Sequence, residues 1–149
     1  MSITLKELIE KNIADGAEIS WSGPVHRSRI QLAERMLGVK FPESYINFIE
    51  EFGSIEIDGF SFSGLSQRNV GEPGDVVAFT KYCRDQYALP KQYIALNFQD
   101  GDYFLSIDTA AADLSSEAPI VLIDPVKKEK HGPIAAPSFG AYLITYLSS

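Results

Sequence analysis

The side chains of this sequence that most strongly suggest chemistry are carboxylates, because several of them lie close together. The segment LGVKFPESYINFIEEFGSIEIDGF, residues 37–60, has no Lys or Arg after Lys40, and its acidic residues are Glu43, Glu50, Glu51, Glu56 and Asp58. Two opposed carboxylates can act as the acid and the base of a glycosidase. A row of carboxylates can also form a surface that attracts a basic protein.

Ordinary structural positions account for these acidic residues better than catalysis does. Glu50 and Glu51 fall on the outer face of a predicted helix. Asp58 and Asp100 each precede a glycine, as turn residues often do. The chain contains no G-x-S-x-G or H-E-x-x-H signature. We therefore predict that the protein is not an enzyme and has no catalytic residue.

The remaining reactive residue types do not form a recognisable metal or cofactor site. His26 and His131 lie in different predicted elements, and neither is at ligand spacing from Cys83. Cys83 is placed on the apolar side of a predicted helix. The segment GEPGD, residues 71–75, precedes a helix but lacks the repeated glycines and the Lys-Ser/Thr pair of a phosphate-binding loop. We predict no metal and no cofactor.

The acidic residues are unevenly distributed along the chain. No Lys or Arg occurs between Lys91 and Lys127, whereas that stretch contains Asp100, Asp102, Asp108, Asp113, Glu117 and Asp124. Lys127, Lys128 and Lys130 then form a separate basic cluster. The net charge of −7 argues against a nucleic-acid ligand, because phosphates are bound by Lys and Arg. The pattern is typical either of a solvated acidic surface or of a landing surface for a cationic protein.

The length and composition predict one domain spanning residues 1–149. Single domains commonly have about 100–150 residues, and the hydrophobic fraction of 45% is that of a globular protein. No apolar run approaches the roughly 20 residues of a membrane span, and the N-terminus lacks the layout of a signal peptide. A single cysteine excludes an internal disulfide. We expect a cytoplasmic protein that does not bind membranes.

Apolar periodicity and capping residues predict five helices. The first begins with a capping box formed by Thr4 and Glu7 and ends at Asp15. The others are predicted at residues 24–37, 42–53, 75–87 and 138–149. Between them, period-2 segments at 55–57, 60–62, 92–108 and 119–124 predict strands. The order predicts a single-domain α+β fold, with N-terminal helices, an antiparallel β meander and a C-terminal helix packed on one face of the sheet.

The segment QYIALNFQDGDYFLSID, residues 92–108, predicts a hairpin with its turn at Asp100-Gly101. That turn pairs Phe98 with Tyr103, Leu96 with Leu105 and Ile94 with Ile107. These six residues then share one face, which must lie against helices. The other face carries Tyr93, Ala95, Asn97, Phe104, Ser106 and Asp108, and we expect it to be exposed.

The helical region RIQLAERMLGVKFPESYINFIEEFGS resembles the SUKH superfamily, the fold of bacterial toxin-immunity proteins and of the fungal cell-wall synthesis regulator. The shared features are Ala33-Glu34, Leu37-Gly38, a Pro at position 42 and an aromatic helix ending in Gly53. Phe41 stands where the family has Leu. The later segments VVAFTKYCRDQYALPKQYIAL, DYFLSIDT, APIVLID and AAPSFGAYLITYL also resemble the family, so that nearly the whole chain is covered.

The resemblance implies a single SUKH-like domain without catalytic residues. It implies an immunity protein that binds the C-terminal domain of a cognate polymorphic toxin, often a nuclease, which is expected to be basic. The residues that we expect to bind this partner are Glu56, Asp58, Asp100, Asp102 and Asp108. Two alternatives remain at this stage: a regulatory or scaffold module that binds an endogenous protein, and an enzyme with a carboxylate pair in a cleft.

Overall fold

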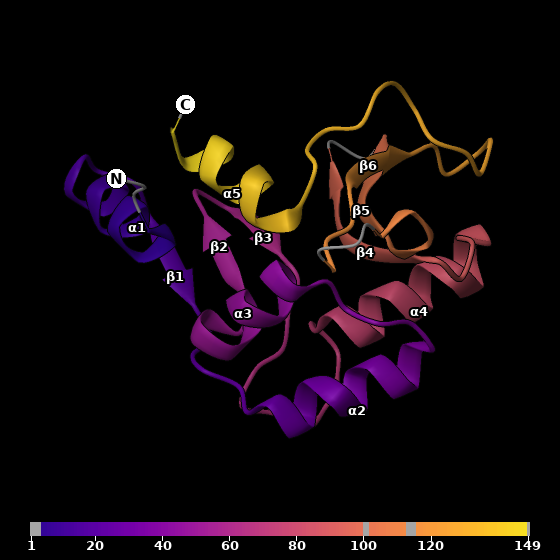
Figure 1. The fold of residues 1–149 in the computed structure, drawn as a ribbon, viewed down its shortest axis with the longest axis horizontal. Coiled ribbons are helices and arrows are strands. Elements are labelled where there is room, and N and C mark those ends of the chain that lie inside the picture. Colours follow the sequence, from indigo (N-terminus) through magenta and orange to yellow (C-terminus); the bar gives the residue numbers. More distant parts are fainter. Residues whose placement is uncertain (1–3, 100–101, 113–115, 149) are drawn as a thin grey trace.

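The computed structural model describes residues 4–99, 102–112 and 116–148 and shows an α+β fold (Figure 1). The helices are α1 (Leu5–Ala14), α2 (Arg27–Leu37), α3 (Glu43–Phe52), α4 (Val76–Tyr87) and α5 (Phe139–Ser148), with a short 3-10 helix η1 (Thr109–Ala111). The strands are β1 (Ile19–Trp21), β2 (Ile55–Ile57), β3 (Phe60–Phe62), β4 (Tyr93–Gln99), β5 (Tyr103–Asp108) and β6 (Ile120–Ile123).

The helices begin where their capping residues predict, with one exception. The Thr4 hydroxyl accepts a hydrogen bond from the Glu7 backbone N–H at 3.1 Å, and Asp75 accepts one from the Ala78 N–H at 2.8 Å. Helix α2 begins at Arg27 rather than near residue 24, because His26 caps it through Nδ1. The histidine ring therefore supplies the acceptor that the first turn of this helix requires.

The strands form two antiparallel sheets, each of three strands, rather than one continuous meander. The order is β1-β2-β3 in the first sheet and β4-β5-β6 in the second. The connection around Trp21 forms β1, which pairs with β2. The sheets adjoin at β3 and β4, where the Ser63 N–H donates to the Leu96 carbonyl at 3.1 Å and the Ser63 hydroxyl donates to the same oxygen at 2.7 Å.

A β-bulge explains why the hairpin register is predicted correctly at one end and wrongly at the other. Ile94 pairs with Ile107 as predicted, but Phe98 pairs with Phe104 instead of Tyr103. The register shifts between Ala95 and Asn97, so that Leu96 is the extra residue. A bulge leaves one residue outside the ladder. The Leu96 carbonyl is therefore available to Ser63 of the first sheet.

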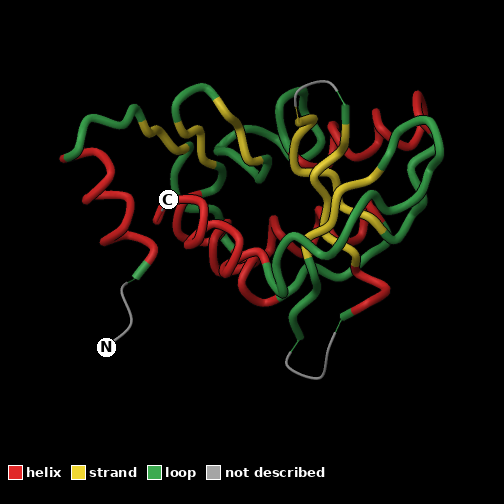
Figure 2. The backbone as a smooth tube through the Cα atoms, turned by 90° about the horizontal axis from the view of Figure 1, so that it is seen from above, coloured by secondary structure: helices red, strands yellow, loops and turns green. Residues whose placement is uncertain are grey.

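The main core lies between helices α1, α2, α3 and α5 and the two sheets. Its aromatic centre is Tyr45, whose ring lies 5.0 Å from that of Phe139. The C-terminal helix packs on one face of the first sheet, as predicted, with the Phe62 ring 5.3 Å from Tyr146. Figure 2 shows α5 on one side of the strands and α4 beyond the second sheet.

The second face of the hairpin is buried, contrary to expectation. Helix α4 covers it, and the Thr80 hydroxyl accepts a hydrogen bond from the Ala95 N–H at 3.1 Å. A smaller second core results, formed by Cys83, Leu89, Tyr93, Ala95, Phe104, Val121 and Ile123. The prediction failed because both faces of this hairpin carry apolar residues, and alternation alone does not show which face a helix will cover.

Candidate partner-binding surface

The face of the first sheet that points away from α5 is polar and uncovered. The strand register places Ser20, Glu56 and Ser61 side by side across β1, β2 and β3, and all three are exposed. Their neighbours Ile55 and Ile57 point to the opposite face and are buried. Alternation with a period of two thus gives this sheet one buried and one exposed face, as predicted. Glu56 lies in the middle strand of the exposed face, as its proposed role in binding requires.

Asp58 lies in the β2–β3 turn at the end of the same sheet and is exposed. Its backbone is in the left-handed region, with φ of 49°, a conformation that Asp tolerates in turns. The Asp58 carboxylate accepts a hydrogen bond from the Glu18 N–H at 2.9 Å, and the Asp58 N–H donates to the Glu18 carbonyl at 2.8 Å. This pairing brings Glu18 beside the turn. Glu18 is exposed and is an acidic neighbour that the sequence analysis did not identify.

Asp102 follows the hairpin turn of the second sheet and is exposed, whereas Asp100 lies outside the described residues. The Asp102 N–H donates to the Gln99 carbonyl at 2.9 Å, and the Gln99 side chain donates to the Tyr142 hydroxyl of α5 at 3.2 Å. At the other turn, burial and, secondarily, the charge of Asp58 raise the pKa of Tyr146, one helical turn beyond Tyr142. Both turns therefore flank α5.

Asp108 is not on an exposed face, and the expectation that it belongs to the binding surface is wrong. Its exposed fraction is 1%, and its carboxylate forms an ion pair with Lys130 at 2.9 Å. It also accepts hydrogen bonds from the Gln92 side chain at 3.0 Å and the Ala110 N–H at 3.2 Å. Lys130 thus belongs to a structural contact, which removes it from the free basic cluster. The hydrogen bond and charge of Asp108 raise the pKa of Lys130.

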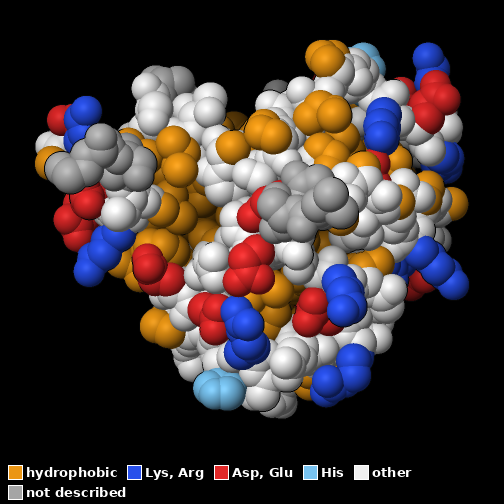
Figure 3. Space-filling model, in the orientation of Figure 1, with side chains coloured by type: hydrophobic (Ala, Val, Ile, Leu, Met, Phe, Trp, Pro, Cys, Tyr) orange, Lys and Arg blue, Asp and Glu red, His pale blue; other side chains and the backbone are white. Residues whose placement is uncertain are grey.

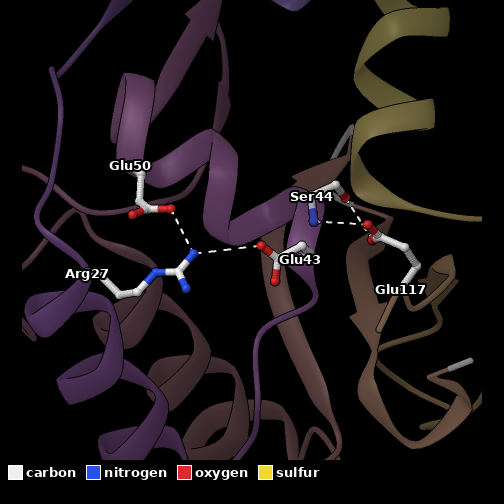
Figure 4. A network of polar contacts seen from close by, with 5 residues as sticks. All are labelled: Arg27, Glu43, Ser44, Glu50 and Glu117. Atoms are coloured by element: carbon white, nitrogen blue, oxygen red, sulfur yellow. Dashed lines mark hydrogen bonds and ion pairs between the residues drawn. The ribbon is translucent and has the colours of Figure 1, made fainter. Parts of the chain in front are cut away.

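Two carboxylates of α3, those of Glu43 and Glu50, form ion pairs with Arg27 (Figure 4). Arg27 donates to Glu50 at 3.0 Å and lies 3.7 Å from Glu43. Figure 4 also shows Glu117 reaching the start of α3, where its carboxylate accepts from the Ser44 N–H at 3.0 Å and the Ser44 hydroxyl at 2.8 Å. In Figure 3 acidic and basic side chains are intermixed over this part of the molecule. This helix therefore contributes less unpaired negative charge than the sequence suggests.

The same view shows hydrophobic side chains gathered in the hollow between α1 and helices α3 and α5 (Figure 3). The cleft there has a volume of about 270 Å³ and is lined by residues that include Leu5, Phe48 and Phe52. Phe48 and Phe52 are themselves buried in the main core. This hollow is the outer edge of the core and carries no acidic binding residue of the predicted set.

A groove beside the polar face is the feature that the sequence analysis missed. One cavity of about 560 Å³ lies between β3, β4 and α4 and is lined on the helix side by Phe79 and Tyr82. A second cavity of about 340 Å³ lies over β1, β2 and β3 and is lined by residues that include Trp21 and Glu56. Ser61, Ser63 and Gly74 line both cavities, so the two adjoin along these residues, and together they are called the groove below.

Asn97 lines this groove and has one buried, unpaired hydrogen-bond acceptor. Its Nδ2 donates to the Ser61 carbonyl at 3.2 Å, which fixes the orientation of the amide because a flipped amide would place two oxygens together. The Oδ1 atom is then buried and, within the described part of the chain, has no hydrogen-bond partner. A buried acceptor without a donor is unfavourable.

Cys83 and His131, the other candidate residues, make packing contacts. Cys83 is fully buried, and burial raises the pKa of its thiol to about 12. The His131 ring stacks on Tyr103, with 4.1 Å between ring centroids. Among residues 4–99, 102–112 and 116–148, no group of three or more His, Cys, Asp or Glu is arranged to hold a metal ion. Over the same ranges no helix is both long and apolar enough to span a bilayer.

Comparison with known protein families gives a match over most of the chain. A family model, SUKH_5, described as SMI1-KNR4 cell-wall, matches residues 5–148. The match extends over nearly the whole chain, and the protein therefore belongs to the SUKH superfamily, within the SMI1-KNR4 family. A search of curated proteins found no significant match. The resemblance drawn from the sequence is confirmed.

Proposed function

We propose that this protein is a bacterial immunity protein that neutralises a cognate toxin domain by binding it in a one-to-one complex in the cytoplasm. Membership of the SUKH superfamily supports a role in binding a protein partner. The proposed toxin is the nuclease domain of a polymorphic toxin, because nucleases carry basic surfaces where they grip nucleic acid. Covering such a surface is sufficient for inhibition, and the immunity protein needs no catalytic group of its own.

This proposal rests on the exposed carboxylates of the first sheet, whose strands contain no Lys or Arg to neutralise them. Residues 17–22 and 54–63, which include its three strands, contain no Lys or Arg. They present three exposed carboxylates, from Glu18, Glu56 and Asp58. Asp102 adds a fourth on the far side of α5, and Asp100 remains a prediction. Charge of one sign on one surface accelerates association with a partner of opposite sign.

The first test is capture of the partner from the native cell. The full chain serves as bait, and bound protein is washed at low and then at high salt. The expected result is one basic protein in a one-to-one complex, inactive while bound and released as salt rises, because salt screens exposed charges. A captured partner that is acidic, or that keeps its activity in the complex, would contradict the proposal.

Charge reversal then tests the surface itself. We expect the double variant Asp58→Lys, Asp102→Lys to lower the association rate by about tenfold at low salt and by less at high salt. Glu51→Lys is the matched control, since Glu51 is an exposed carboxylate on α3. Equal rates for the double variant and the native protein would place the binding surface elsewhere.

A regulatory or scaffold role is the second candidate, favoured by the cell-wall description of the matching family. In that case the partner is an endogenous signalling or envelope protein. Capture of such proteins, together with the absence of a neighbouring gene whose product ends in a toxin-like domain, would favour this alternative. A neighbouring toxin gene would favour immunity.

A further inference from the structure

The groove between the first sheet and α4 combines two kinds of surface. On its helix side, Phe79 and Tyr82 provide an apolar wall. On its sheet side, Ser20 and Ser61 provide hydroxyl groups and Glu56 provides a carboxylate. An occupant that satisfies both sides must bring an apolar group and a polar group close together.

The polar side of the groove offers more acceptors than donors. The Ser61 hydroxyl donates to Glu56 Oε1 at 3.5 Å, and the Ser61 carbonyl accepts a hydrogen bond from Asn97 Nδ2. The buried Asn97 Oδ1 and the exposed Glu56 carboxylate thus lie on either side of Ser61, and the carboxylate is the acceptor that an occupant can reach. A cation with several N–H groups matches this arrangement. Arginine fits best, because its planar guanidinium presents five donors.

Aromatic side chains at the two rims point to a protein as the occupant. Tyr82 is 52% exposed at the α4 rim, and Trp21 is 45% exposed at the β1 edge. Exposed Tyr and Trp are enriched in protein interfaces, where they provide rigid contact area. The absence of Lys and Arg from residues 17–22 and 54–63 leaves the sheet side attractive to a cation.

We propose that this groove binds a segment of the protein partner in which an Arg side chain lies next to an aromatic side chain. The guanidinium donates to the exposed Glu56 carboxylate, and the aromatic ring packs against Phe79 and Tyr82. This inference rests on the proposed function, in that the partner is a basic protein, and it adds the position and chemistry of the contact. Glu56 is then a specificity-determining residue rather than one charge among several.

The test is an NMR titration of the full chain with two capped peptides that differ at one position. The first is acetyl-Ser-Phe-Arg-Phe-Ser-amide, and the second has Glu in place of Arg. We expect the arginine peptide to cause saturable shifts of the Asn97 side-chain amide and of the Ser61 and Gly74 backbone amides at millimolar concentration. Shifts of the same size with the glutamate peptide, or shifts confined to other regions, would overturn the proposal.

Variants of the native protein test which residues of the groove bind the arginine peptide. We expect Glu56→Gln to weaken binding of the arginine peptide by about fivefold, because it removes the charge from one exposed hydrogen bond. Ser61→Tyr should abolish binding by filling the groove, and Tyr is well tolerated in strands. Glu51→Gln and Thr145→Tyr are the matched controls, at exposed positions of α3 and α5. The spectra themselves show whether each variant is folded.

The outcome separates this inference from the proposed function. If a basic partner is captured from cells equally well by the native protein and by Ser61→Tyr, the groove proposal is overturned and the immunity proposal stands. If the arginine peptide binds in the groove and Ser61→Tyr blocks it, the groove proposal is supported, even where the captured partner is a regulatory protein rather than a toxin.

Discussion

Helix α3 depends on a cap supplied from a distant part of the chain. Its own N-cap residue is Pro42, which offers no side-chain acceptor. The carboxylate of Glu117 provides that acceptor instead, through hydrogen bonds from the Ser44 N–H at 3.0 Å and the Ser44 hydroxyl at 2.8 Å (Figure 4). The Ser44 hydroxyl in turn accepts from the Gly140 N–H at 3.1 Å. One glutamate therefore joins the starts of α3 and α5.

We predict that Glu117→Ala destabilises the protein by about 1–3 kcal/mol. Loss of a capping acceptor costs about 0.5–2 kcal/mol. Loss of a negative charge near a helix N-terminus costs about 0.3–1 kcal/mol more. Glu117→Gln keeps one oxygen acceptor for Ser44 but loses the charge and the second acceptor oxygen, so we expect it to cost less than Glu117→Ala, about 0.5–2 kcal/mol.

The assay is urea unfolding followed by circular dichroism, with the midpoint compared at constant slope. For a domain of this size, the Glu117→Ala change corresponds to a melting temperature lower by about 2–12 °C. Glu43→Ala is the matched control, because the Glu43 carboxylate also lies near the start of α3, in its first turn, but is exposed and lies 3.7 Å from Arg27. A loss of stability in Glu117→Ala no greater than that in Glu43→Ala would refute the capping role.

Three further predictions concern buried polar groups. Tyr45→Phe should cost about 1–2 kcal/mol in urea unfolding, because the Tyr45 hydroxyl donates to the Ser63 carbonyl at 2.6 Å in the core; unchanged stability would show that this bond is unimportant. Burial raises the pKa of Cys83 from 9.0 to about 12, so the folded protein keeps a proton that the unfolded chain releases, and stability should fall as pH rises from about 9 towards 12. Cys83→Ala should flatten that pH profile, and an equally steep profile would contradict the assignment. Lys130→Met should cost about 1–3 kcal/mol because it removes the ion pair of the buried Asp108, and a variant as stable as the native protein would show that the two remaining donors suffice.

The local elements could be predicted from the sequence, because their signals lie within a few residues. The caps at Thr4 and Asp75 each involve a side chain and a backbone N–H three positions away. The alternation of Ile55 and Ile57 with Glu56 likewise follows from the geometry of a strand, and Glu56 and Asp58 are exposed as expected. The motifs of the chain, in their order and spacing, resemble those of the SUKH superfamily, and the family match confirms that resemblance.

The site required the tertiary structure, because its features join residues that are far apart in the chain. The bulge at Leu96 leaves a carbonyl that accepts from Ser63, a residue 33 positions away in the chain. The groove exists because α4 lies beside that junction. Packing also decided which acids are free: Asp108 is buried and paired with Lys130. A sequence pattern shows which residues are acidic, but their exposure depends on which distant segment folds over them.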